Sequence, residues 1–382
     1  MLSRREVVLH SPHEGEAGRR EVWLMGIETA GGFEGLFSEA GGIARFQNAL
    51  VDWFRSVGRD YPWRRTRDPY SIFVSEAMLQ QTQVATVLGR GYFTRWMAAF
   101  PTWGDLAAAT EGEVLKQWEG LGYYNRARNL RKTAQIVIRD FGGRFPEDFE
   151  TILTLPGVGR YTAGAVTSFA FNRRAAIVDG NVSRVFSRLF AFAEPIDTSS
   201  GHRVMWDWAE ALTPETDPGL YNSALMELGQ RICLRASPNC PVCPVRSWCA
   251  AGLQGTALEF PVKKGGRAIT VRQERVILAV KNHRILLCPE TGPRRKGLWR
   301  LPEITFEESA DLAELFRFDY TITRYRVTLM VFQYTGSLPE GEPEGACWFA
   351  AGRDEEMPAI GSPYRKAIKM FSEFRDGLPI KG

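Results

Sequence analysis

The rest of the chain is organised around residues 155–188, LPGVGRYTAGAVTSFAFNRRAAIVDGNVSRVFSR. The stretch opens with a tight turn whose two glycines, Gly157 and Gly159, can adopt positive φ. Apolar residues at helical spacing precede and follow this turn, so the sequence predicts a helix, a hairpin and a second helix. The unpaired N–H groups at a helix N-terminus bind anions, and glycines let a phosphate approach closely. A phosphate of a DNA backbone is therefore the expected ligand.

A second feature of this stretch is Asp179-Gly180-Asn181, directly before an amphipathic run of apolar residues. An aspartate in this position is more often an N-cap than a catalyst, and a lone LPGVG is only a turn. The hairpin, the aromatic Tyr161 just beyond it and an aspartate at this spacing form a more specific combination. A carboxylate at the start of this helix would lie close to the phosphate-binding turn.

Upstream, residues 71–87, SIFVSEAMLQQTQVATV, predict a helix that begins at Asp68-Pro69. Aspartate is a common N-cap, and proline is favoured at the first helical position. Glu76 interrupts an apolar stripe of this helix. It is either a glutamate at the rim of the core, paired with an arginine, or a partly desolvated carboxyl with a raised pKa. The second environment is what a general acid needs at neutral pH.

Residues 118–128, WEGLGYYNRAR, combine two glycines, two tyrosines and two arginines. One interpretation is an aromatic core loop with solvated arginines. The other is a surface that pries a duplex open, because an inserted side chain replaces the base stacking that is lost.

These motifs resemble those of the adenine DNA glycosylase (MutY) family of the helix–hairpin–helix DNA glycosylase superfamily. SEAMLQQTQVATV matches the family motif almost residue for residue, with Glu76 in the place of the catalytic glutamate. The resemblance implies that Glu76 protonates N7 of a flipped adenine, and that Tyr161 and Asn181 arrange the site. Asp179 would stabilise the sugar cation or form a transient covalent adduct. The implied substrate is double-stranded DNA with adenine opposite 8-oxoguanine or guanine, bound by a monomer.

The resemblance also implies contacts to DNA. Tyr123 would wedge beside the damaged base, and Gln81 would insert near it. The predicted DNA-binding residues are Gln81, Thr82, Leu121, Tyr123, Gly157, Gly159, Arg64, Thr323 and Arg324.

Two other functions are considered. A bifunctional, endonuclease III-like glycosylase/lyase carries a lysine directly after Gly-Arg in its hairpin, where the amine can form a Schiff base. Here that position is Tyr161, and Glu76 has no counterpart in that family. A non-catalytic iron–sulfur redox sensor that binds DNA would not need both Glu76 and Asp179. Monofunctional hydrolysis of the N-glycosidic bond is therefore the predicted reaction.

Four cysteines lie within seventeen residues: Cys233, Cys240, Cys243 and Cys249. In a reducing compartment this density favours a metal over disulfides. Zinc is the commonest ion for closely spaced cysteines, but the spacing of six, two and five intervening residues lacks the two equal knuckles of a zinc ribbon. The spacing resembles the loop of endonuclease III and adenine glycosylases that holds a 4Fe–4S cluster.

The C-terminal third changes to a strand pattern, with strands expected at 275–280, 284–288, 325–334 and 346–350 and helices near 312–316 and the C-terminus. It resembles the Nudix-like domain of the family, and Gly297–Glu303 resembles the start of the pyrophosphohydrolase signature. The acidic magnesium-binding helix that should follow is absent, so this domain is expected to bind without hydrolysing nucleotides. Where the family carries Phe-Ser-His to read 8-oxoguanine, this chain has Ile322, Thr323 and Arg324. The Thr323 hydroxyl can accept and donate, whereas Arg324 can only donate.

Composition agrees with a two-domain globular protein: 382 residues, 44% hydrophobic and 24% charged, with a formal net charge of +4. No apolar run approaches transmembrane length, so we expect a cytoplasmic, nucleoid-associated protein. The predicted fold is a mostly α catalytic region followed by an α+β Nudix-like domain. The predicted division is a poorly structured extension at 1–42, the catalytic region at 43–250, a linker at 251–268 and the 8-oxoguanine-recognition domain at 269–382. Within the catalytic region, a six-helix barrel covers about 69–170, and 43–68 with 171–250 form the cluster-bearing part.

Overall fold

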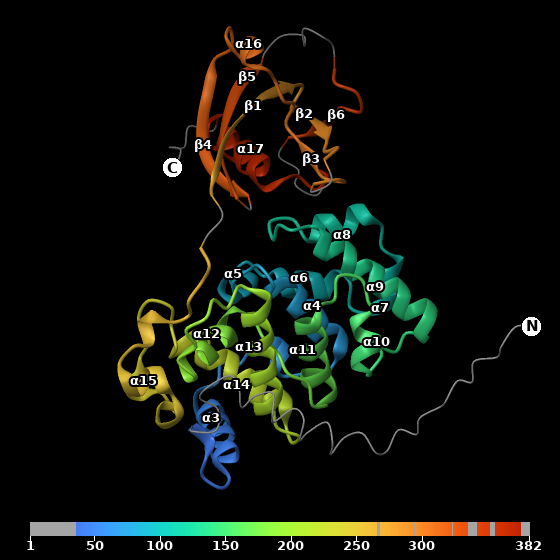
Figure 1. Cartoon of the computed structure of the whole chain (residues 1–382). Helices are drawn as coiled ribbons and strands as arrows, with labels where there is room; N and C mark the ends of the chain where they lie inside the picture. Colours follow the sequence, from blue (N-terminus) through green and yellow to red (C-terminus); the bar gives the residue numbers. More distant parts are fainter. Residues whose placement is uncertain are drawn as a thin grey trace, which may run out of the picture. The chain divides into compact units, whose positions relative to one another are not determined.

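Figure 1 shows the computed structural model of the chain, which describes residues 36–265, 268–292, 295–322, 324–334, 342–351 and 356–375. Contacts divide the chain into two compact units. Unit 1 contains residues up to 67 together with 160–264, and unit 2 contains 68–159 together with the residues from 265 onward. Within the described ranges, no helix is long and apolar enough to cross a membrane.

Unit 1 is helical and has one apolar core. Its helices are α3 (Gly42–Val57), α11 (Arg160–Phe171), α12 (Gly180–Leu189), α13 (Ser199–Leu212), α14 (Pro218–Arg231) and α15 (Ala250–Gln254), with short 3-10 turns at Pro62–Arg64, Cys240–Val242, Arg246–Trp248 and Ala257–Glu259. Helix α14 contacts α3, α11 and α12. Phe46, Leu50 and Phe186 are fully buried in the core between these helices. Gly164 lets α11 approach the next segment closely, because a Cβ there would lie 2.1 Å from the Ala176 carbonyl oxygen.

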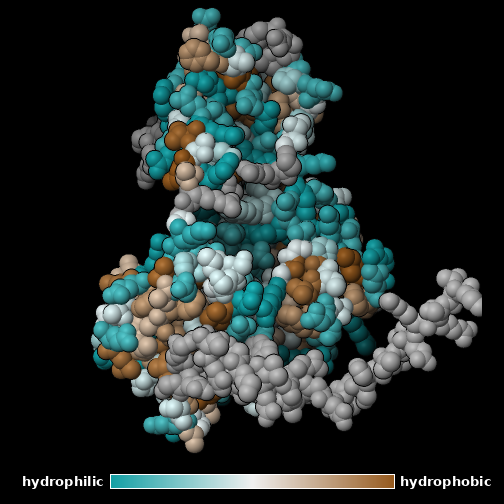
Figure 2. Space-filling model, in the orientation of Figure 1, coloured by the Kyte–Doolittle hydropathy of each residue, from teal (hydrophilic) through white to brown (hydrophobic). Residues whose placement is uncertain are grey.

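Residues at the inner ends of the predicted extension and linker pack on unit 1. Residues 1–35 of the extension lie outside the described residues, whereas Phe37 packs edge-to-face on Phe46 at 5.5 Å. At the other boundary, α15 and the following turn fold onto unit 1 because small residues such as Ala251 are fully buried. The chain stays attached as far as Lys264, whose backbone N–H donates to Asp197 over 2.8 Å. Figure 2 shows apolar residues on the surface around α15, where Leu253 and other apolar side chains are exposed.

The first part of unit 2 is a set of short helices: α4 (Pro69–Leu79), α5 (Val84–Gly89), α6 (Tyr92–Ala99), α7 (Trp103–Ala108), α8 (Glu111–Gln117), α9 (Asn125–Phe141) and α10 (Phe149–Leu153). Polar caps and a glycine separate several of these helices. Thr102 and Thr110 each form a capping box, with Asp105 and Glu113 respectively. Gly142 ends α9 with a φ of 59°.

The second part of unit 2 is a mixed sheet. Its strands are β1 (Thr270–Lys281), β2 (Arg284–Pro289), β3 (Trp299–Arg300), β4 (Glu314–Ile322), β5 (Tyr325–Tyr334) and β6 (Cys347–Ala350). The order is β3-β2-β1-β5-β4, and β6 pairs with β2. Strands β1 and β5 are parallel, whereas the other pairs are antiparallel. Helix α17 (Ser362–Arg375) covers one face, where its Ala367 belongs to the same buried apolar cluster as Leu329 and Val331.

The prediction of a helix near 312–316 was wrong. Strand β4 begins at Glu314, and the helix of this segment, α16, is only four residues long (Phe306–Ser309). The apolar spacing of Leu312, Leu315 and Phe316 fits helical periodicity, but the pairing of β4 with β5 satisfies the backbone of 314–322 instead. The predicted C-terminal helix is confirmed as α17.

Candidate active site and DNA interface

Glu76 lies in the most thoroughly buried helix of the predicted site. Asp68 caps α4 by accepting hydrogen bonds from the backbone of Tyr70 and Ser71, and Pro69 occupies the first turn. The consecutive residues 72–78 are all buried, and Glu76 is only 4% exposed. The helix therefore has no solvated face here, and Glu76 lies inside the protein rather than at the rim of its core.

Tyr123 projects from a strained loop next to this helix. Gly120, Gly122 and Tyr123 itself have φ values of 95°, 69° and 48°. The Tyr123 side chain is 53% exposed. Holding a non-glycine residue in the left-handed region costs free energy, and such strain concentrates at ligand-binding positions. Leu121, also predicted to meet DNA, is instead buried at 6% exposure.

Arg126 joins the Tyr123 loop to the Glu76 helix. Its guanidinium donates to the carbonyls of Ala77 and Met78 at the end of α4, at 2.7 and 2.9 Å. It also donates to the carbonyls of Leu121 and Gly122, at 3.0 and 3.1 Å. Burial lowers the pKa of Arg126 to about 10. Arg126 is thus a buried bracket between helix and loop, and neither sequence interpretation of its arginine-rich stretch anticipated this.

Gln81 and Tyr123 line a pocket of about 790 Å³ in unit 2. Gln81 is exposed beyond the end of α4, and the neighbouring Thr82 hydroxyl is buried with no hydrogen-bond partner among the described residues. The pocket lining includes Gln80, Gln81, Leu121, Tyr123, Asn125, Asn129, Phe318, Tyr320, Ile322 and Lys366. Aromatic rings, amides and a cation are the groups that bind nucleic-acid bases and phosphates.

The backbone and its neighbours require a glycine at only one of the two hairpin positions. Gly157 has a φ of 75°, and a Cβ there would lie 2.2 Å from the Asn129 side-chain nitrogen. A Cβ on the exposed Gly159 would meet no protein atom within 4 Å. The turn itself therefore requires Gly157 but not Gly159, so open space lies beside the N-terminus of α11.

Asp179 is the N-cap of α12 and the centre of a hydrogen-bond chain. One carboxylate oxygen, Oδ1, accepts from the backbone of Asn181 and Val182 at 2.9 and 2.7 Å, and Oδ2 accepts from the Asn181 amide at 2.9 Å. The Asn181 side-chain oxygen accepts from Arg184 at 2.9 Å, and Arg184 also donates to the Cys233 carbonyl at 2.8 Å. The geometry is thus compatible with both interpretations of Asp179, as an N-cap and as a catalytic group, because a capping carboxylate can also face a substrate. Tyr161, from α11, places its hydroxyl 3.9 Å from the sulfur of Met226.

The four clustered cysteines lie near one another in unit 1. Burial, reinforced by the charges of the other three thiols, raises the pKa of Cys243 to about 12. Arg188, almost fully buried, donates to the Cys233 sulfur at 3.3 Å and to the Leu234 carbonyl at 2.7 Å. The donor set is therefore four thiols with a guanidinium beside them. No group of His, Cys, Asp or Glu side chains in the described part of the chain is arranged to hold a single metal ion.

Sequence analysis missed Glu227, a carboxylate buried under three arginines. Its oxygens lie 2.6 Å from Arg59, 3.0 Å from Arg64 and 3.9 Å from Arg231, and its side chain is fully buried. Arg64 is only 16% exposed, and Tyr61 packs against its guanidinium at 4.7 Å. Arg64 is therefore already held in an ion pair within the protein, and its contact with DNA stays a prediction. A single charged residue in the apolar stretch ALMELG was the available signal for Glu227.

Two of the three predicted lesion-reading residues are described: Ile322 ends β4, and Arg324 directly precedes β5. Thr323 lies outside the described residues. Arg324 is exposed, and its guanidinium lies 5.2 Å from the centre of the Tyr325 ring and donates to the Tyr325 hydroxyl at 3.1 Å.

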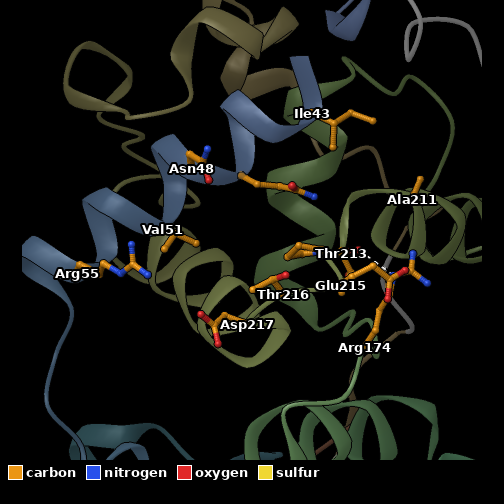
Figure 3. Close-up of a pocket in the computed structure, with 12 residues that line it drawn as sticks. Ile43, Asn48, Val51, Arg55, Arg174, Ala211, Thr213, Glu215, Thr216 and Asp217 are labelled. Carbon is orange, nitrogen blue, oxygen red and sulfur yellow. Dashed lines mark hydrogen bonds and ion pairs between the residues drawn. The ribbon is translucent and has the colours of Figure 1, made fainter. Parts of the chain in front are cut away.

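A further pocket, in unit 1, is lined by none of the predicted site residues. Figure 3 shows it between α3 and the segment 213–217, with a volume of about 560 Å³. Arg174 on its wall donates to the Thr213 carbonyl at 3.0 Å and lies 3.4 Å from Glu215. Arg174, the Thr213 carbonyl and Glu215 on this wall therefore already bind one another.

Comparison with known proteins identifies the family. A family model described as "HhH-GPD superfamily base excision DNA repair protein" matches residues 74–210. The chain is 45% identical over 226 residues to the adenine DNA glycosylase of Rattus norvegicus, which covers 56% of this chain and 43% of that protein. It is 36% identical over 258 residues to the adenine DNA glycosylase of Buchnera aphidicola subsp. Baizongia pistaciae, covering 67% of this chain and 71% of the relative.

A solved structure of a thermostable thymine-DNA glycosylase is also similar, with a TM-score of 0.51 and 32% identity over 56% of this chain and 97% of that chain. This chain spans less than half the length of the rat relative, but most of the length of the Buchnera relative. The helical fold, the matched model and these identities together confirm that the chain belongs to the adenine DNA glycosylase family of the HhH-GPD superfamily.

Proposed function

We propose that this protein is a monofunctional adenine DNA glycosylase of base excision repair, which removes adenine opposite 8-oxoguanine or guanine. The observation that carries the proposal is the burial of Glu76 in a helix segment whose other buried side chains are apolar except for Ser75. Breaking an N-glycosidic bond requires a proton for the leaving base and a negative charge near the sugar cation. A buried carboxyl is suited to the first task, because burial disfavours its charged form.

In the proposed reaction, Glu76 donates its proton to N7 of a flipped adenine while the bond between the base and C1′ breaks. Asp179 stabilises the resulting cation, directly or as a transient adduct. Water then adds to C1′ and passes its proton to the Glu76 carboxylate left by the first step. The position of Asp179 at the N-terminus of α12 supports this role, because the helix dipole stabilises an anion there. Asn181 orients the Asp179 carboxylate through its amide, and Tyr161 completes the site.

Two alternatives are weaker. A bifunctional glycosylase/lyase needs an amine in the hairpin motif, and this chain has Tyr161 there. The similar solved structure is a thymine-DNA glycosylase, but the adenine glycosylase relatives are more similar in sequence.

We further propose that double-stranded DNA contacts the surface formed by the Tyr123 loop, the hairpin and the β4–β5 turn. Tyr123 is exposed and strained, which supports its role as a wedge between bases. Gln81 lines the same pocket as Tyr123. The open space at Gly159 supports a phosphate-binding site there. Thr82, Leu121, Gly157 and Arg64 complete the proposed interface. The buried Leu121 would act by shaping the loop rather than by touching DNA.

We propose that Cys233, Cys240, Cys243 and Cys249 hold a 4Fe–4S cluster. A zinc ion would need its sulfurs about 3.8 Å apart, from Zn–S distances of about 2.3 Å in a tetrahedron. A cluster binds one cysteine at each iron and so accepts a wider spacing. The four thiols fit this donor set, and Arg188 can balance part of its negative charge. When bound, the cluster would hold the cysteine loop rigid.

We propose that residues 269–382 form a Nudix-like domain that recognises 8-oxoguanine, with Thr323 reading the lesion and Arg324 binding DNA. The mixed sheet covered by α17 supports this assignment. We also propose the predicted division of the rest of the chain into an extension, a barrel of about 69–170, a cluster-bearing part and a linker. We expect a monomer that acts at the nucleoid.

The test is single-turnover excision of adenine from duplexes with 8-oxoguanine, guanine or cytosine opposite it. We expect Glu76→Gln to bind the A:8-oxoguanine duplex but to excise about 10²- to 10⁴-fold more slowly. Glu150→Gln, at an exposed position on α10, is the matched control and should behave like the wild type. Near-wild-type rates for Glu76→Gln would refute the assignment, and efficient borohydride trapping of the wild type would refute monofunctional chemistry.

A further inference from the structure

We propose that three cations on the face of the C-terminal sheet that carries α17, Arg272, Arg324 and Lys366, form a binding site for the phosphodiester backbone of DNA. This inference rests on the proposed function in one respect, namely that the chain binds DNA. It adds a site whose contribution is affinity and orientation rather than recognition of the lesion.

Each of the three cations lies against an aromatic ring. The Arg272 guanidinium lies 4.2 Å from the centre of the Tyr325 ring, and the Arg324 guanidinium lies 5.2 Å from the same centre. The Lys366 ammonium lies 4.3 Å from the centre of the Phe318 ring. All three cations are exposed.

The three side chains gather on one face of the sheet. Strands β1 and β5 pair in parallel with Thr270 opposite Tyr325, so Arg272 and Tyr325 are diagonal neighbours that project to the same side. That side carries α17, because the alternate residues Val276 and Leu329 of the same strands pack in its core. Lys366 comes from α17 itself, and Phe318 comes from β4.

Other cations of the C-terminal part of unit 2 form ion pairs with carboxylates. These ion pairs join Arg295 with Glu290, Arg300 with Glu303, Arg317 with Glu314, and Arg365 of α17 with Glu119. Arg295 also lies against the rings of Tyr320 and Tyr364, so a ring and a carboxylate hold it together. Among the described residues, none of Arg272, Arg324 and Lys366 forms an ion pair. The face near the β4–β5 turn therefore carries three cations that no carboxylate of the described residues pairs with.

An aromatic ring and a carboxylate have different effects on a cation. A carboxylate neutralises the cation and competes with any anionic ligand. A ring attracts the cation through its quadrupole, by about 0.5–1 kcal/mol at exposed sites, and leaves its charge in place. The ring also restricts the rotamers of a long side chain, so less conformational entropy is lost when a ligand binds. Cations arranged in this way are preorganised for an anion that spans several of them.

A phosphodiester backbone fits better than the modified base. Arginine and lysine only donate hydrogen bonds, and phosphate oxygens only accept them. Such contacts position DNA without reading its sequence. Lys366 and Phe318 also line the pocket that contains Gln81 and Tyr123, so a strand bound here would lie beside the proposed wedge.

The test is the salt dependence of duplex affinity for the full-length protein. We expect Arg272→Gln, Arg324→Gln and Lys366→Gln each to make the plot of log affinity against log salt shallower by about 0.9, or about eightfold weaker binding at 0.1 M salt. The change should be the same for A:8-oxoguanine, A:G and undamaged duplexes. Tyr325→Leu should weaken binding less and leave the slope unchanged, because it removes the ring but no charge.

Three controls separate this site from general charge effects. Arg317→Gln removes a cation paired with Glu314, Lys369→Gln removes a charge from α17 one turn after Lys366, and Arg275→Gln removes a ring-held cation from the opposite face. All three should keep the wild-type slope.

The proposal is overturned if the three site variants keep the wild-type slope, if the controls lose as much, or if the losses occur only with 8-oxoguanine. Failure of the proposed function looks different, because it appears as a wild type that binds duplex DNA but excises no adenine.

Discussion

Asp179 has a structural and a proposed chemical role, and two substitutions can separate them. Asp179→Ala removes both the cap and the charge, whereas Asp179→Asn removes only the charge. The structure shows why: Oδ1 alone accepts both capping hydrogen bonds, from the backbone of Asn181 and Val182. An asparagine oxygen in the same place can keep them, and asparagine is as good an N-cap as aspartate.

The expected stability changes follow from these contacts. Asp179→Ala should lower the free energy of unfolding by about 1–2 kcal/mol, the usual cost of removing a cap. Asp179→Asn should cost about 1 kcal/mol or less, because it loses the favourable dipole interaction and one hydrogen bond from the Asn181 amide, now opposite another amide. Both variants remain folded.

The expected loss of activity is larger than either stability change and similar for both variants. Removing a group that stabilises charge in a transition state slows a reaction about 10²- to 10³-fold, or about 3–4 kcal/mol. Urea unfolding measures the stabilities, and single-turnover excision of adenine opposite 8-oxoguanine measures the chemistry. The reasoning is refuted if Asp179→Asn excises adenine at the wild-type rate, which would make Asp179 a cap only. It is also refuted if Asp179→Asn is as unstable as Asp179→Ala.

Three further predictions concern the hairpin, the cysteines and the sheet. Gly159→Ala should leave stability unchanged, because its Cβ meets no protein atom, but should weaken duplex binding severalfold in a mobility-shift titration; unchanged binding would show that no phosphate approaches there. Cys240→Ser should lose the broad visible absorbance of an iron–sulfur centre, and a colourless wild type with stoichiometric zinc would contradict the cluster. Glu119→Arg and Arg365→Glu should each destabilise the attachment of α17 to the helical part of unit 2, since their side chains form a two-point ion pair. The double variant should restore wild-type thermal stability, and two additive losses would show that the pair does not couple these parts.

The sequence by itself determined the local elements and the family. The Asp68-Pro69 start of α4, the capping boxes at Thr102 and Thr110 and the turn at Gly157 each depend on a few neighbouring residues. Such features are specified by backbone conformation and by hydrogen bonds between residues close in sequence, so they can be predicted without knowing the packing. The glutamate of α4, the aspartate before α12 and the four cysteines were identified because their spacing matched known motifs.

Tertiary structure decided which charged residues are buried and what they hold. Arg126 and Arg64 look alike in the sequence, as arginines beside aromatic residues, yet the first brackets α4 and the second neutralises the buried Glu227. The segment 312–316 has helical spacing, but pairing with β5 makes its residues from Glu314 onward part of strand β4. Likewise, the sequence shows arginines throughout the C-terminal part, and only strand register and packing decide which are held by carboxylates and which by rings. The physical reason is that the partner of a charge is chosen in space, by residues distant in the chain, and local spacing carries no information about that choice.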